Sequence, residues 1–421
     1  MPTTGEAPAA RTPAPWKELL RACPGFAWLW LAQTLSALGD RVHFVAFPWL
    51  FLDITGSPGR LSLMAVLNFL PVLLFGVASG VVIDRSSRRS VLVISNALSL
   101  ALVGSVPAAY WLGRLSEVHL YLATFLAGTA RVFAENGAQA YLPEIVPRPF
   151  LLRANSALQA GQSFATIAGP TLSGVLIAAS GAAAGVALNA ASFGVAAAII
   201  AAIPVTAPAV LSRRPPMSSL KEGLVYLLRN RLVLNIAILL VAVNFATAPT
   251  STLLFYRLKD ELAFSPSISG LILSGGGAAA LLGAVAARAL GRADRWKTLL
   301  LLFGAIGAGL LLMGFTAAPL WTGLAWSLIC LSVSIALVLI STLRQEIVPN
   351  ELLGRVSAAS RTLALLAVPV AVSLGGAASE RFGSAAVFYG AGAIVALTAI
   401  AGSLTRNPWS SPGGEVSRWK T

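Results

Sequence analysis

The tetrapeptide Glu-Ile-Val-Pro stands at residues 144–147 and again at residues 346–349, and each copy has an arginine six residues further on. The two copies are 202 residues apart, and the register then holds without a gap to Gly181 and Gly383. Each copy lies in a short polar stretch before an apolar run long enough to cross a bilayer as a helix. A duplication of this size in a membrane chain is typical of transporters, because two similar half-bundles can move about a site held between them.

The composition indicates a chain that lies in a bilayer. Hydrophobic residues make up 57% of it and charged residues 11%, with a mean hydropathy of +0.79, which leaves too little polar surface for a soluble fold. We predict an all-α integral membrane protein whose twelve transmembrane helices form two pseudo-symmetric six-helix halves around a central cavity. The expected spans are 26–52, 61–83, 90–111, 118–140, 156–179, 182–204, 231–256, 266–289, 297–316, 319–343, 356–378 and 384–404.

The net charge of +14 is explained by topology and requires no nucleic-acid partner. With both termini placed in the cytoplasm, 22 of the 30 Lys and Arg residues fall on the cytoplasmic side, 5 fall outside and 3 fall within spans. This asymmetry follows the positive-inside rule and predicts a multi-pass protein of the plasma membrane with cytoplasmic termini. The many Ala, Gly and Arg residues, against only five Lys, are typical of a bacterial source with GC-rich DNA.

The predicted organisation has five parts. Residues 1–25 form a cytoplasmic segment, 26–204 and 231–404 form the two six-helix halves, 205–230 form a cytoplasmic linker, and 405–421 form a cytoplasmic tail. The two cysteines provide neither a disulfide framework nor a metal-ligand spacing, and only two histidines are present, so we expect no metal site.

A glycine and a carboxylate precede a basic cluster between the second and third spans. Gly80, Asp84, Arg85 and Arg89 fit a pattern G-x-x-x-D-R-x-x-R-R that resembles the cytoplasmic signature of the Major Facilitator Superfamily. In that family the loop latches the two halves together when the cytoplasmic side is closed. The resemblance implies that Asp84 is the latch carboxylate and that Arg85 and Arg89 are its ionic partners. A positive-inside loop with a chance Gly and Asp is the plainer alternative.

The fifth span contains Gly169-Pro170, followed by Ser173 and Gly174. This resembles the antiporter motif of drug-exporting branches of the same superfamily, which usually carry a second glycine where Ser173 stands. Proline removes a backbone donor and kinks a helix, while small residues allow another helix to approach closely. The alternative is a packing kink that says nothing about the direction of transport.

Stretches along nearly the whole chain resemble a twelve-span bacterial branch of drug:proton antiporters that includes macrolide efflux proteins and catecholate-siderophore exporters. They are residues 36–40, 47–50, 55–57, 142–147 and 348–355. The resemblance implies the Major Facilitator fold and proton-driven efflux. It does not identify the cargo, because members of a fold share scaffold more than substrate.

Charged residues inside predicted spans are functional candidates, because an isolated charge in hydrocarbon costs several kcal/mol. Asp40, in the first span, shares one helical face with His43, Phe44 and Phe47, while Arg41 points about 100° away from that face.

The fourth span carries Arg131, Glu135 and Gln139 on one face, and the eleventh carries Arg361 near its cytoplasmic end. The resemblance implies that spans one and four line the cavity of the first half, so Asp40 and Arg131 are expected near one another.

We predict that Asp40 and Glu135 carry coupled protons, with Arg41 and Arg131 as buried charge partners. His43, one turn from Asp40, is either a proton relay or a plain hydrogen-bonded histidine of the helix. Burial favours the protonated form of a carboxylate and a neighbouring arginine favours the ionised form, so cargo that disturbs the pairing would move a proton. A static ion-pair network that holds the two spans together is the alternative. The residues expected to line the cavity are Phe44, Phe47, Gln139, Gln159, Gln162 and Asn244.

The sequence contains no nucleotide-binding loop, and it shows no nucleophile–base set, so we expect neither an enzyme nor a cofactor. The predicted function is efflux of a small amphiphile, namely an antibiotic, a secondary metabolite of the host or a siderophore, driven by the proton gradient through alternating access. The expected partners are the cargo, protons and the lipid bilayer, and the expected state is a monomer. Two alternatives stay open: a proton-coupled symporter that imports a solute, and a transport-inactive membrane receptor or scaffold.

Overall fold

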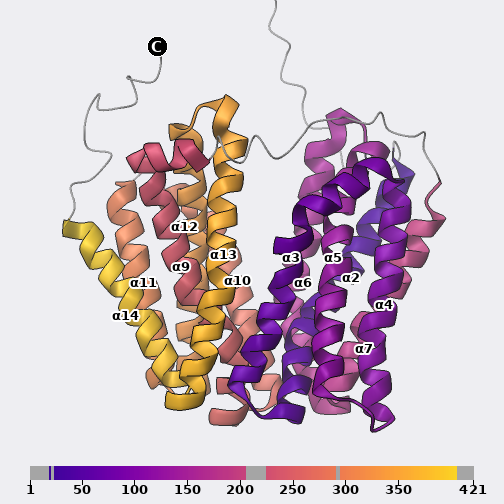
Figure 1. Cartoon of the computed structure of the whole chain (residues 1–421), viewed down its shortest axis with the longest axis horizontal. Helices are drawn as coiled ribbons and strands as arrows, with labels where there is room; N and C mark the ends of the chain where they lie inside the picture. Colours follow the sequence, from indigo (N-terminus) through magenta and orange to yellow (C-terminus); the bar gives the residue numbers. More distant parts are fainter. Residues whose placement is uncertain (1–18, 20–22, 205–223, 291–293, 405–421) are drawn as a thin grey trace, which may run out of the picture.

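The computed structural model describes residues 19, 23–204, 224–290 and 294–404. Within these ranges twelve long helices form two groups of six (Figure 1). The first group is α2 (Pro24–Thr55), α3 (Pro58–Arg85), α4 (Arg88–Trp111), α5 (Glu117–Ile145), α6 (Leu151–Ser180) and α7 (Ala182–Ala202). The second is α9 (Arg231–Tyr256), α10 (Pro266–Leu290), α11 (Arg295–Phe315), α12 (Pro319–Ile347), α13 (Asn350–Phe382) and α14 (Ser384–Leu404). The predicted tail at 405–421, most of the segment at 1–25 and residues 205–223 of the predicted linker at 205–230 lie outside the described residues.

The twelve predicted spans are confirmed as twelve helices, and ten of these are long and apolar enough to cross a membrane on composition alone. The two that fall short are α2 and α5, which carry Asp40, Arg41, Arg131 and Glu135. Their lower hydropathy therefore has a local cause, the charges in the interior of the first group. A charge that faces the interior of a bundle is compatible with a membrane span.

The internal repeat is visible in how the helices end. Gly181 ends α6 with φ 81° and ψ 165°, and Gly383, 202 residues later, ends α13 with φ 79° and ψ 161°. Only glycine adopts such backbone angles without strain. Several helix starts are fixed by serine caps, as at Ser57, whose hydroxyl accepts a hydrogen bond from the Arg60 amide at 3.2 Å. The duplicated sequence thus encodes duplicated helix boundaries.

The two groups meet at one end of the bundle and separate toward the other (Figure 1). We call the end with the α2–α3 turn the Ser57 end, and the end with the α3–α4 turn the Asp84 end. One hydrophobic cluster includes Phe51 of α2, Leu254 of α9 and Phe388 of α14, and it therefore joins both groups. Near the Asp84 end each group has its own cluster, around Phe26 in the first and around Leu343 in the second. The bundle is closed at the Ser57 end and open at the Asp84 end.

Candidate functional site

A cavity of about 910 Å³ lies between the groups toward the Asp84 end. It is lined by the first half of α2, the last half of α5, the first half of α6 and the last half of α10. Of the residues predicted to line it, Gln139, Gln159 and Gln162 do so. Asn244 of α9 does not line it, and its amide donates to the Leu240 carbonyl at 2.8 Å.

Two smaller pockets continue the cavity into the first group. A pocket of about 220 Å³ shares Arg41, Glu135 and Gln162 with the large cavity. An inner pocket of about 120 Å³ shares Asp40 and Arg131 with that connecting pocket and has no lining residue in common with the large cavity. The three spaces therefore form a series that leads from the open end to Asp40. Phe44 and Phe47, predicted to line the large cavity, line the inner pocket instead.

The predicted charge cluster is brought together, with a different pairing from the one expected. A guanidinium nitrogen of Arg131 donates to Asn68 Oδ1 at 3.0 Å, and its Nε lies 3.9 Å from a carboxylate oxygen of Glu135, whose side chain is 63% exposed. No ion pair within 4 Å joins Asp40 to an arginine in the described part of the chain. Asn189 of α7 lines the inner pocket together with Asp40. Sequence patterns did not reveal Asn68 or Asn189, because each is one polar residue in an apolar helix.

His43 lies in the inner pocket with Asp40, one turn further along α2. Its ring stacks on Phe47 with 4.7 Å between the centroids. Its Nδ1 is buried and has no hydrogen-bond partner among the described residues. A buried ring nitrogen without a partner is uncommon, and water in this polar pocket can satisfy it.

The closed Ser57 end is held by polar contacts between the groups that sequence analysis did not predict. The Lys259 ammonium lies 2.7 Å from Asp53 of α2 and 5.9 Å from the centre of the Trp49 ring. The Ser57 hydroxyl donates to Glu380 of α13 at 2.6 Å. The charged residues among them, Asp53, Lys259 and Glu380, lie at or near the ends of helices, and their partners can be identified only from the fold.

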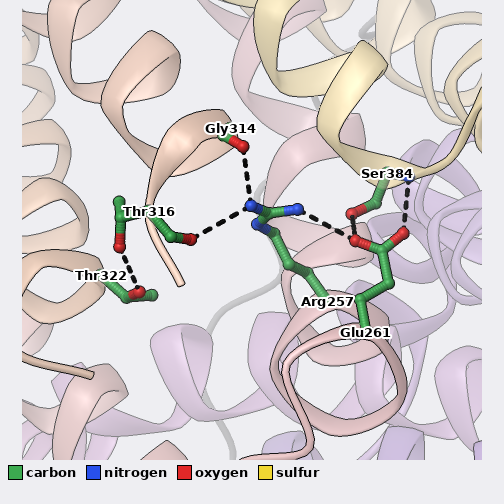
Figure 2. Close-up of polar contacts among 6 residues, drawn as sticks. All are labelled: Arg257, Glu261, Gly314, Thr316, Thr322 and Ser384. Atoms are coloured by element: carbon green, nitrogen blue, oxygen red, sulfur yellow. Dashed lines mark hydrogen bonds and ion pairs between the residues drawn. The ribbon is translucent and has the colours of Figure 1, made fainter. Parts of the chain in front are cut away.

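Lys259 stands in a short π-helical turn, η2 (Arg257–Glu261), that is fastened on both sides (Figure 2). Arg257, which is 5% exposed, donates to the carbonyl oxygens of Gly314 at 2.8 Å and Thr316 at 3.2 Å and pairs with Glu261 at 3.0 Å. Glu261 accepts hydrogen bonds from the amide and the hydroxyl of Ser384, at 2.8 and 2.5 Å. The carboxylate thus caps the start of α14 and the guanidinium caps the end of α11, both favourable for the helix dipoles.

The predicted kink motif lies where α6 packs between α2 and α10. A Cβ on Gly169 would overlap the Arg41 side chain, and a Cβ on Gly174 would lie 2.5 Å from the carbonyl oxygen of Pro266. The Ser173 hydroxyl donates to the Val42 carbonyl at 2.9 Å. Ser173 therefore fastens α6 to the backbone of α2.

The second half repeats this contact. Gly376 of α13 is the counterpart of Gly174, and a Cβ on it would lie 2.5 Å from Ser62 Cβ of α3. The α6–α10 and α3–α13 contacts are thus equivalent seams between the groups. The glutamates of the repeat behave alike too: Glu144 pairs with Arg88 at 3.0 Å, and Glu346 pairs with Arg295.

At the Asp84 end the residues of the predicted latch lie apart from the opposite group. Asp84 and Arg85 are exposed, and neither has an ion pair within the described ranges. Arg89 donates to the carbonyls of Ile200 and Ala201 at the end of α7. A Cβ on Gly80 would meet nothing within 4 Å, so no helix approaches closely there. The latch is open in this conformation, and its role stays a prediction.

Comparison with known proteins agrees with this architecture. The family model described as Major Facilitator Superfamily matches residues 29–372. A multidrug efflux pump, Tap of Mycobacterium bovis, is 32% identical over 271 residues, which are 62% of this chain and 65% of that protein. The enterobactin exporter EntS of Escherichia coli is 26% identical over 348 residues, which are 80% of this chain and 81% of that protein. The crystal structure of the nucleoside transporter NupG superposes with a TM-score of 0.73 at 11% identity, over 91% of this chain and 100% of that one.

Proposed function

The chain belongs to the Major Facilitator Superfamily, and from this premise we propose that it exports a small amphiphilic organic molecule across the bacterial plasma membrane in exchange for protons. The observation that carries the proposal is the position of Asp40. Its carboxylate stands at the end of the series of spaces that begins at the open cavity, beside Arg131 but without an ion pair within 4 Å in the described structure. A carboxylate at such a place can take up and release a proton as its neighbours move.

The direction of transport depends on which end of the bundle faces the cytoplasm. The Asp84 end carries Arg85, Arg88 and Arg89 in or beside one short turn, and by the positive-inside rule these charges support a cytoplasmic position for it. In this proposed orientation the cavity is open to cytoplasmic cargo and the outer end is shut. Closure of the Asp84 end and opening of the Ser57 end would deliver the cargo outside.

Export is supported by two further observations. The kink motif of α6, which resembles that of drug exporters, lies at the α6–α10 seam between the two groups. A change in the angle of α6 there would change how closely the two groups pack. Two relatives bear names that state efflux or export, a multidrug pump and an enterobactin exporter. Their cargo differs, so the cargo of this chain is proposed only as a class.

Proton flux in inside-out vesicles tests the proposal. The vesicle interior is acidified, and macrolides, catecholates, lipophilic cations and neutral natural products are added one at a time. The proposal predicts that at least one compound collapses the gradient in vesicles that contain the protein and not in matched vesicles without it. Cargo accumulation that needs no gradient, or that runs only toward the cytoplasmic side, would contradict it.

A further inference from the structure

The polar side chains of the large cavity all lie on the side of α2, α5 and α6, where they stand among apolar ones such as Leu142 and Leu158. On one wall, α5 and α6 present the amides of Gln139, Gln159 and Gln162. These side chains are exposed and make no hydrogen bond within the described structure. On the other wall, α10 presents Ala280, Leu281 and Ala284, without a polar side chain. Gln159 and Gln162 are three residues apart and therefore share one face of α6, and Ala280 and Ala284 are four apart and share one face of α10.

The charges at this cavity are balanced. Arg41 and Glu135 are the charged residues among those that line it, one of each sign. A cavity with this lining has no net charge with which to select a cation or an anion. A carboxamide offers both donors and an acceptor, so three of them match hydroxyl, ether and carbonyl groups rather than ions.

We propose that the cargo is an uncharged, oxygen-rich amphiphile that places its polar edge on the α5–α6 amides and its apolar face on α10. Glycosides and polyhydroxylated polyketides or terpenoids have this chemistry. The volume of about 910 Å³ lies at the upper end of the usual range for small-molecule sites, about 300–1,000 Å³, and suits a cargo of several rings. The proposal rests on the proposed export function and names the cargo class for the same cavity.

The position of the deep end of the cavity supports this orientation. There α10 meets α6, because a Cβ on Gly277 would lie 2.8 Å from the carbonyl oxygen of Thr166. Gln162 lines both the cavity and the connecting pocket, so a cargo hydroxyl bound to it lies on the side that leads to Asp40. The polar edge of the cargo would therefore face the proton-binding region and its apolar face would point away.

The test measures equilibrium binding to the full-length protein in lipid nanodiscs, with empty nanodiscs subtracted. The probes are two glycosides with their aglycones, digitoxin with digitoxigenin and ginsenoside Rg1 with protopanaxatriol, and two charged amphiphiles, cholate and tetraphenylphosphonium. We expect at least one glycoside to bind more tightly than its own aglycone and than both ions. Equal binding within both pairs, stronger binding of an ion, or no binding of either glycoside would overturn the proposal.

Matched variants locate the polar edge. Gln159→Met and Gln162→Met keep the side-chain length and remove the amide, so each should weaken glycoside binding about fivefold, as expected for one net hydrogen bond, and leave aglycone binding unchanged. Gln345→Met, at an exposed amide of α12 outside the cavity, is the control. Equal losses for glycoside and aglycone, or no loss for either, would overturn the assignment of the polar edge.

The binding test is independent of proton coupling, because it is made without a pH gradient. Failure of proton exchange together with intact glycoside selectivity would therefore contradict only the proposed function.

Discussion

The ammonium group of Lys259 lies 2.7 Å from the carboxylate of Asp53, and this ion pair joins the two groups of helices across the Ser57 end. The lysine is 14% exposed and the aspartate 45%. A partly exposed pair of this kind contributes about 1 kcal/mol or less. That small energy is compatible with the proposed alternating access, in which this ion pair would have to break each time the Ser57 end opens.

Removal of this pair should shift the bundle toward opening at the Ser57 end. Lys259→Met keeps the apolar stem and removes the charge, and a loss of about 1 kcal/mol corresponds to about a fivefold change in the ratio of the two states. Spin labels at Leu112 and Phe382, both exposed residues near the Ser57 end in opposite groups, report the separation. Arg60→Gln, which breaks the Arg60–Glu117 pair inside the first group, should leave the distance distribution unchanged.

The glycine seams should not tolerate even one methyl group. Gly174→Ala and Gly376→Ala would place a Cβ 2.5 Å from the Pro266 carbonyl oxygen and from Ser62 Cβ, respectively. Overpacking of this kind costs about 1–3 kcal/mol, so both variants should lower the melting temperature in detergent. Gly76→Ala, where a Cβ meets nothing within 4 Å, is the control. Equal melting temperatures for all three variants would mean that the seams are looser than the structure indicates.

The Arg257–Glu261 contact should stabilise the second group and position Lys259 (Figure 2). Arg257→Met leaves the carboxylate without its buried partner, and such losses cost about 3–5 kcal/mol. We expect a lower melting temperature together with the same opening of the Ser57 end as in Lys259→Met. Lys297→Met removes a cation whose side chain is 79% exposed, and it should do neither.

The latch prediction can be tested from the open state. Asp84 is exposed in this conformation, so Asp84→Asn should leave the melting temperature of the protein unchanged. If Asp84 holds the halves together only in the other conformation, the variant should spend more time open at the Asp84 end. Maleimide labelling of Gln159→Cys in the cavity would then be faster in the Asp84→Asn background. Equal labelling rates would remove Asp84 from the latch.

Much of the fold could be predicted from the sequence, because hydrophobic runs and a long internal repeat are local or self-similar signals. Asp40, Arg131 and Glu135 were found because a charge within an apolar run is conspicuous. The pairing of Arg131 with Asn68 was not predictable, since it depends on which faces of α3 and α5 meet. The ion pair between Asp53 and Lys259 was not predictable for the same reason, since residues 206 positions apart become neighbours only when the two groups of helices pack together.

The repeat was informative beyond the helix count. Gly174 was predicted as part of the kink motif, where a small residue lets another helix approach. In the structure Gly174 and its counterpart Gly376 each lie against a helix of the opposite group, which is why neither position has room for a Cβ. The latch residues illustrate the limit of such patterns. Arg88, which is part of the pattern but was not predicted to act in the latch, pairs with Glu144, while Arg89, a predicted latch partner, caps α7. A motif gives residue types at positions, and the conformation decides the contacts.

The central claim is that Asp40 couples cargo movement to protons. It is tested most directly by measuring cargo exchange at equal pH and cargo accumulation under a pH gradient in separate experiments. Proteoliposomes that contain the wild-type protein or Asp40→Asn are loaded with a compound that collapses the gradient in the vesicle assay. At equal pH on both sides, the variant should still exchange labelled for unlabelled cargo, because alternating access does not require the proton. Under a pH gradient it should fail to accumulate cargo, whereas the wild type accumulates it. Accumulation by Asp40→Asn with the full pH dependence of the wild type would contradict the account.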